Sequence, residues 1–210
     1  MSKPLQNFIL LGCLSALMSI AAVPAALVQA QSSPIEFSQL SDPEQAALRQ
    51  GEILVTGEVA HFEGRMLVTA APTVVWNVLT DYANFSKFIP NVVSSEILES
   101  NGNQKTIEQT SIRQVFVVTV RSRIRSALTE TPQQQIDFKM IEGDLESLQG
   151  RWTMEPISTS SLSSPQVLIT YTADAEPPPG PFEDAFPEIY RRSLRETLTG
   201  IRTEIKRRSQ

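Results

Sequence analysis

The stretch APTVVWNVLTDYANFSKFIPNV, Ala71–Val92, interrupts a chain that otherwise alternates like β-strands, and it decides the order of elements in the fold. Pro72 fits the first turn of a helix, where its missing N–H would have no partner. Asn84 can cap a second short helix, which Pro90 ends. The stretch therefore predicts two short helices that share a dense aromatic group: Trp76, Tyr82, Phe85 and Phe88.

A long amphipathic helix is predicted at the C-terminus, after the stiff loop EPPPGP at Glu176–Pro181. Asp184 can cap this helix, and Pro187 fits its first turn. Gly200 costs about 1 kcal/mol inside a helix, which a close approach to a sheet would explain. One face carries a long apolar stripe, formed by Phe186, Ile189, Tyr190, Leu194, Leu198, Ile201 and Ile205.

Between the two helical regions the hydrophobic period changes to two, which predicts successive antiparallel strands. The tripeptide Asn101–Asn103 predicts a hairpin turn. Farther on, Arg121, Arg123 and Arg125 alternate with smaller or apolar residues, so this strand has one solvated and one covered face. The covered face carries Val120, Ser122, Ile124, Ser126 and Leu128.

The segment before the first short helix also alternates, as one bent strand or two, with Gly57 and Gly64 at the bend or turn positions. Upstream of it, Ser41 and Glu44 can form a capping box for a short helix that Gly51 ends. Together these elements predict an α+β fold. A curved antiparallel sheet of about six or seven strands would surround the long C-terminal helix, with two short helices after the first strand.

The N-terminal residues have the layout of an export signal, because Lys3 precedes the uncharged run Phe8–Val28. Pro24 interrupts the run and Ala30 suits a signal peptidase, so we expect cleavage after Ala30 and a periplasmic or other extracytoplasmic location. The run is also long enough to span a bilayer, which leaves an N-terminal membrane anchor as the alternative. The expected organisation is a signal peptide at 1–30, an N-terminal arm with a short helix at 31–50, and one domain at 51–210.

The composition excludes several kinds of site. Cys13, in the signal, and His61 are the only cysteine and histidine. The mature chain can therefore build no site on thiolates or on several imidazoles, and we expect no metal and no cofactor. Residues 31–180 carry a net charge of −8 and residues 181–210 one of +2, so we expect no nucleic-acid partner.

The stretch IEGDLESLQGRW, Ile141–Trp152, is open to three interpretations: an acid/base site, a metal site or a turn between strands. Its acids, Glu142, Asp144 and Glu146, have no Cys or cluster of His to join. We therefore expect them to be turn and surface residues.

Two segments resemble a known family. Val68–Leu98, VTAAPTVVWNVLTDYANFSKFIPNVVSSEIL, and Met140–Pro156, MIEGDLESLQGRWTMEP, are similar to the START-like superfamily of polyketide cyclases, birch-pollen-allergen-like proteins and lipid carriers. Within it they resemble the coenzyme Q-binding, cyclase/dehydrase-type branch. The likeness covers roughly residues 51–207, and it departs at Asp144-Leu145, where family members often have Pro-Phe.

The resemblance implies a helix-grip fold, with a curved sheet wrapped around the C-terminal helix and a START-like domain at 51–210. It also implies a cavity for a hydrophobic molecule between the sheet, the short helices and the helix stripe. The residues expected to bind that ligand are Phe85, Phe88, Phe116, Phe138, Met140, Trp152, Tyr171, Phe186, Tyr190 and Leu194.

Three functions follow as hypotheses. The first is binding, sequestration or transport of a lipid or quinone-like small molecule by a monomer that touches the membrane surface transiently. The second is a cyclase or dehydratase in the same cavity, for which Tyr171, Tyr190 and Glu142 are the candidate proton donors and acceptors; we favour a carrier over an enzyme. The third is an interaction module that docks through basic residues of the C-terminal helix, Arg191, Arg192, Arg195, Arg202, Lys206, Arg207 and Arg208.

Overall fold

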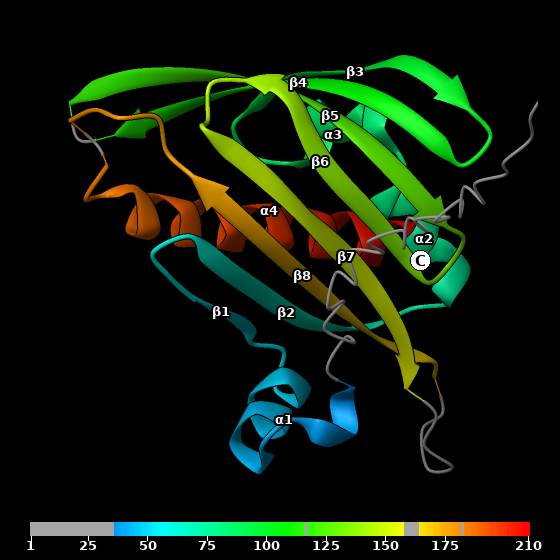
Figure 1. Cartoon of the computed structure of the whole chain (residues 1–210). Coiled ribbons are helices and arrows are strands. Elements are labelled where there is room, and N and C mark those ends of the chain that lie inside the picture. Colours follow the sequence, from blue (N-terminus) through cyan, green and yellow to red (C-terminus); the bar gives the residue numbers. More distant parts are fainter. Residues whose placement is uncertain (1–35, 116, 158–163, 182) are drawn as a thin grey trace, which may run out of the picture. The chain divides into compact units, whose positions relative to one another are not determined.

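An antiparallel sheet curves around one long helix in the computed structural model, which describes residues 36–115, 117–157, 164–181 and 183–210 (Figure 1). The helices are α1 (Asp42–Arg49), α2 (Pro72–Leu79), α3 (Phe85–Phe88) and α4 (Phe186–Arg208), with short 3-10 turns at Phe37–Gln39 and Tyr82–Asn84. The strands are β1 (Ile53–Glu58), β2 (His61–Thr69), β3 (Val92–Asn101), β4 (Gln104–Val115), β5 (Val118–Thr131), β6 (Gln135–Gly143), β7 (Ser147–Ile157) and β8 (Gln166–Glu176).

The predicted α+β class and helix-grip arrangement are confirmed. Within the described residues the sheet has 8 strands in the order β1-β2-β8-β7-β6-β5-β4-β3, more than the expected six or seven. The additional strand arises because the segment before α2 forms two strands, which turn at Val59 with a positive φ of 58°.

The prediction that Gly64 lies at a bend or turn is wrong, because Gly64 lies inside β2. A Cβ there would be 2.7 Å from Leu198 Cδ1 and 3.1 Å from Leu194 Cδ2. The missing side chain therefore lets α4 pack directly on β2, because any larger residue would collide with the helix. α4 packs on β1 and β2 in this way, and its far side faces the rest of the sheet.

The predicted helix stripe is confirmed, since Leu194, Leu198, Ile201 and Ile205 are buried. Two details differ from the prediction. The N-cap residue is Ala185 and not Asp184. The close approach at Gly200 is to the connection after α3 and not to the sheet: a Cβ there would collide with the carbonyl oxygen of Phe88.

Arginines of α4 cover the free edge of the sheet at β1. Arg191 donates to the carbonyl oxygen of Gly57 at 2.6 Å, and Arg195 donates to that of Ile53 at 2.6 Å. An edge strand exposes such unpaired carbonyls, which can recruit a strand from another chain. The arginines satisfy these carbonyls, so this side of the sheet is protected against edge-to-edge pairing.

The N-terminal arm packs on the outer face of β2 and β8. Ser41 and Glu44 form the predicted capping box, with the Ser41 backbone N–H donating to Glu44 Oε2 at 3.0 Å. A small apolar cluster outside the sheet joins the arm to it, made by Phe37, Leu40, Leu48, Leu67 and Leu168. The arm is therefore part of the folded body.

No helix in the described part of the chain is long and apolar enough to cross a membrane. The predictions for the export signal, for Cys13 and for cleavage after Ala30 all concern residues that lie outside the described ranges.

Candidate functional site

A cavity of about 240 Å³ lies between the sheet, α3 and α4. Its volume is close to the lower end of the range for small-molecule sites. One end of the wall is apolar, and its residues come from both short helices, four strands and α4: Leu79, Tyr82, Phe85, Ile89, Val92, Ile107, Leu128, Ile136 and Ile201. An apolar group placed at this end would contact apolar side chains in place of water.

Six of the ten predicted ligand-binding residues line this cavity: Phe85, Phe138, Trp152, Tyr171, Tyr190 and Leu194. Phe88 packs edge-on against Phe85 but is not part of the wall, and Phe186 packs against Phe62 instead. Met140 is half-buried on β6 beyond the cavity, and Phe116 lies outside the described residues. Ligand binding by these residues stays a prediction.

An aromatic wall at the middle of the cavity comes from adjacent strands. The rings of Phe138 and Tyr171 stack with centroids 5.5 Å apart, and Trp152 meets Tyr171 edge-on at 4.7 Å. Gly150 lies opposite Phe138, and a Cβ there would be 2.6 Å from the Phe138 ring. The glycine of the hairpin stretch thus makes room for a large apolar contact surface.

Two tyrosine hydroxyls meet at the cavity wall. The Tyr171 and Tyr190 oxygens are 2.7 Å apart and share a hydrogen bond. Burial raises the pKa of Tyr190 to about 12 and raises that of Tyr171 as well. Both hydroxyls are therefore neutral at pH 7, able to donate a hydrogen bond but poorly suited to act as a base.

The other end of the cavity is polar, and it was not predicted from the sequence. Its side chains come from β4, β5 and α4: Gln109, Ser111, Arg113, Ser122, Ser193 and Thr197. Arg113 is the only charged residue among the described residues of the wall, and its NH1 is 3.3 Å from Glu196 Oε2. The available signal was the run Ile107-Gln109-Ser111-Arg113, which shares one strand face and becomes polar along its length.

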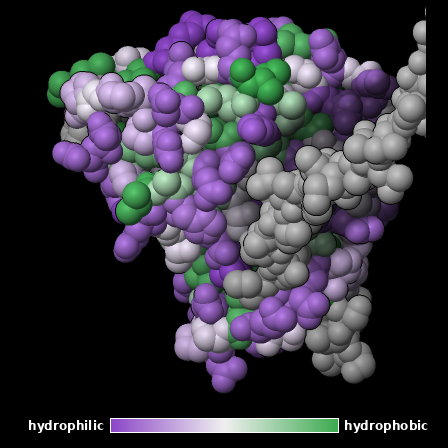
Figure 2. Space-filling view, viewed as in Figure 1, coloured by the Kyte–Doolittle hydropathy of each residue, from purple (hydrophilic) through white to green (hydrophobic). Residues whose placement is uncertain are grey.

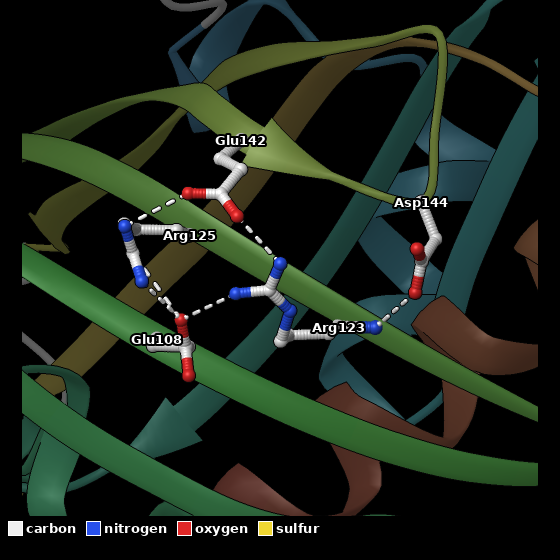
Figure 3. Close-up of polar contacts among 5 residues, drawn as sticks. All are labelled: Glu108, Arg123, Arg125, Glu142 and Asp144. Atoms are coloured by element: carbon white, nitrogen blue, oxygen red, sulfur yellow. Dashed lines mark hydrogen bonds and ion pairs between the residues drawn. The ribbon is translucent and has the colours of Figure 1, made fainter.

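The predicted covered face of β5 is confirmed, because Ser122, Ile124, Ser126 and Leu128 all line the cavity. The arginines point the opposite way. On the outer face, Arg125 and Arg123 both pair with Glu108 and Glu142, at distances from 2.5 to 3.0 Å (Figure 3).

The hairpin acids are turn and surface residues, as predicted. Glu142 pairs with arginines outside the sheet, and the exposed Asp144 accepts the backbone N–H of Arg123 at 2.7 Å (Figure 3). Figure 2 shows hydrophilic residues over much of this face of the molecule, with hydrophobic ones in small groups between them. Glu142 therefore does not face the cavity and cannot serve as its acid or base there.

The described residues contain no group of three His, Cys, Asp or Glu side chains that could hold a metal ion.

Most of the basic residues on α4 already bond to this chain. Arg191, Arg195 and Arg202 donate to backbone carbonyls at or next to β1, and Arg207 and Arg208 pair with Glu204. These contacts leave little of the predicted basic docking surface to a partner.

The helix-grip fold with its internal cavity defines a class of small-molecule-binding proteins, and sequence comparison gives the family. Residues 68–199 match the family described as polyketide cyclase / dehydrase and lipid transport, and the chain belongs to it. The predicted START-like membership is thereby confirmed, while the coenzyme Q-binding branch stays a prediction. A comparison with curated proteins finds no match.

Solved structures share the fold at low sequence identity. The chain is similar to the Zhui aromatase/cyclase from Streptomyces, with 19% identity, coverage of 71% of this chain and 95% of that one, and a TM-score of 0.54. A START superfamily protein from Mycobacterium smegmatis has 12% identity, coverage of 70% and 98%, and a TM-score of 0.58. A STAR-related lipid transfer protein from Xanthomonas axonopodis has 16% identity, coverage of 74% and 98%, and a TM-score of 0.54.

Proposed function

We propose that the protein binds a lipid-like small molecule in this cavity and sequesters or carries it. The observation behind the proposal is a cavity of about 240 Å³ whose wall carries aromatic and aliphatic side chains. Each methylene that a ligand buries there contributes about 0.8 kcal/mol, so affinity grows by roughly 15-fold for every two carbons. Growth of that size is the signature of a ligand tail inside a cavity.

Alkyl alcohols test the proposal, because they vary the tail without adding charge. Trp152 lines the cavity and reports occupancy by its fluorescence once Trp76, the other of the 2 tryptophans, is replaced by Phe. We expect affinity to rise steeply from hexanol to decanol and to level off when the cavity is full. Native mass spectrometry of the purified full chain identifies any ligand that remains bound.

A matched pair of substitutions on β6 provides the control. Phe138→Asp places a carboxylate in the cavity wall, whereas Ile141→Asp places the same group on an exposed strand position, 57% accessible. We expect Phe138→Asp to abolish alcohol binding and Ile141→Asp to leave it unchanged. Equal loss in both variants, or affinity independent of chain length, would contradict a cavity-bound ligand.

The alternative of a cyclase or dehydratase has weaker support. Acid–base chemistry on a substrate needs a donor and an acceptor in contact with it. Among the described residues the cavity wall has no carboxylate, and its tyrosines are held neutral. Turnover of a polyketone probe that is lost in Tyr171→Phe, with ligand binding retained, would favour the enzyme.

We also propose that residues 1–30 direct export, so that the ligand is met outside the cytoplasm. The support is the charge-free run after Lys3 and the small residues that end at Ala30. N-terminal sequencing of the protein from an exporting host tests this: Gln31 as the first residue supports cleavage, and an intact Met1 in the membrane fraction supports the anchor.

A further inference from the structure

The charged residue in the cavity indicates which kind of lipid-like molecule the cavity takes. We propose that the ligand is amphipathic, with an anionic head, a carboxylate or phosphate, bound at Arg113 and an apolar tail directed toward Tyr82 and Leu128. The inference rests on the proposed function and adds a ligand class and an orientation to it.

The cavity has two chemically different ends along the same pair of strands. Toward Tyr82, the lining residues of β4 and β5 are Ile107, Ser126 and Leu128, whereas toward Arg113 they are Ser111 and Ser122, which lie opposite each other. The wall therefore changes from mostly apolar beside Tyr82 and Leu128 to hydroxyl-rich near Arg113. A uniformly apolar ligand would cover those hydroxyl and guanidinium donors without bonding to them, while an amphipathic one bonds to the polar end and fills the apolar one.

Arg113 has donor capacity to spare. A guanidinium carries five N–H groups, and in the described part of the chain its one ion pair is with Glu196, through NH1 at 3.3 Å. That distance is longer than a good N–H···O bond. The same oxygen of Glu196 also accepts a hydrogen bond from Asn91 Nδ2, at 2.9 Å. The remaining donors of Arg113, whose side chain is 25% exposed, are available to an anion.

The surroundings of Arg113 favour a negative ligand group. Burial lowers the pKa of Arg113, the Glu196 carboxylate opposes that shift, and the positive charge of Arg192 adds to it. Arginine keeps its charge, and the ion pair of the half-buried Arg113 with Glu196, at 3.3 Å, offsets the lost hydration only in part. An anionic head that enters the cavity supplies the missing charge, and Ser111 and Ser193 line the same end as further hydrogen-bond donors.

Three ligands with the same tail test the proposal: decanoate, decyl phosphate and decan-1-ol, each titrated against the full chain with Trp152 fluorescence. We expect the two anions to bind more tightly than the alcohol. Arg113→Met should weaken both anions by about 10- to 100-fold, the range for hydrogen bonds to a charged group, and leave decanol unchanged. The anion that loses more identifies the head group that the site suits better.

Two variants separate anion binding from a structural role of Arg113. Arg121→Met removes the same charge from the exposed face of the sheet and should change no affinity. Glu196→Gln removes the competing carboxylate and should raise the affinity for decanoate by about 2- to 5-fold, whereas a purely structural ion pair predicts a loss. Arg113→Lys keeps a cation and should retain part of the preference for anions.

The outcomes are distinct. If decanoate, decyl phosphate and decanol all fail to bind, both this proposal and the proposed function are overturned. If all three bind equally and Arg113→Met weakens them equally or not at all, only the anion site is overturned. Selective loss of the anions, with a cooperative thermal unfolding transition retained, supports it.

Discussion

Replacing Gly200 by alanine tests how α4 is positioned, because helix propensity and steric collision change stability in opposite directions at this residue. Replacing a helix-interior glycine by alanine normally stabilises a protein by about 1 kcal/mol. In this chain the new Cβ would lie 2.8 Å from Pro90 Cδ and 3.3 Å from Ile89 Cα, and it would collide with the Phe88 carbonyl oxygen. Carbon atoms in good contact are about 3.5–4.0 Å apart, so the segment after α3 would have to move.

We expect the steric effect to exceed the gain in helix propensity. Overpacking costs about 1–3 kcal/mol, and the upper end applies because the colliding groups are backbone and a proline ring, which cannot rotate away. After the gain of about 1 kcal/mol, a net loss of about 2 kcal/mol remains. For a protein of this size that loss lowers Tm by about 4–8 °C. Phe85 and Ile89 belong to the displaced segment and line the cavity, so decanol affinity should fall as well.

Thermal unfolding followed by circular dichroism measures the effect, with Thr199→Ala as the control. Thr199 is the exposed neighbour of Gly200 on α4, so its replacement tests helix propensity without the collision. We expect that control to keep Tm or to raise it slightly. A rise in Tm for Gly200→Ala would refute the argument, because it would mean that α4 and the α3 connection have room between them.

Three further changes follow from the structure. The two hydrogen bonds from Arg207 and the one from Arg208 lower the pKa of Glu204 to about 2. The Glu204 carboxylate therefore stabilises the fold above its unfolded pKa of about 4.3, and this stabilisation is lost as the pH falls from there toward 2. In Glu204→Gln, Tm should fall less steeply over this pH range than in the wild type. Tyr171→Phe removes the hydrogen bond between the Tyr171 and Tyr190 hydroxyls and should lower the free energy of unfolding in urea by about 0.5–1.5 kcal/mol. An unchanged free energy of unfolding would show that this hydrogen bond does not stabilise the fold. Exposing the β1 edge by Arg195→Met should raise light scattering at high protein concentration, and scattering equal to that of wild type would contradict the protective role.

Local patterns predicted the architecture because each depends on neighbours in the sequence. The two-residue alternation of β5 identified its covered face, and the stripe on α4 identified the face that packs on the sheet. The positions of Gly64 and Gly200 were harder to interpret. A glycine that permits close approach and one that permits a turn look the same in sequence, and only the packing of α4 distinguishes them.

The cavity was predicted only in part, because strand alternation gives a face but not the region of that face that stays open. Phe88 and Phe186 were predicted to bind the ligand, yet they pack on other rings, outside the cavity wall. Arg113 was overlooked because a lone arginine in a polar strand usually faces solvent. The partial burial of Arg113 depends on the register of β4 against β5 and on the distance of α4 from both strands. No local sequence pattern specifies either of them.

The two faces of the sheet divide the charges of this chain, and that division bears on function. On β4, β5 and β6, the outer face pairs Glu108 and Glu142 with Arg123 and Arg125, so these charges neutralise one another in contact with solvent. Among the described residues that line the cavity on the inner face, Arg113 is the one charged group, in an otherwise neutral wall. An acid–base catalyst requires proton acceptors inside, whereas a selective carrier requires one group that recognises a head and a surface that holds a tail. The arrangement of charges supports the proposed carrier; Arg113→Met tests its head-group site, and Tyr171→Phe tests the enzyme.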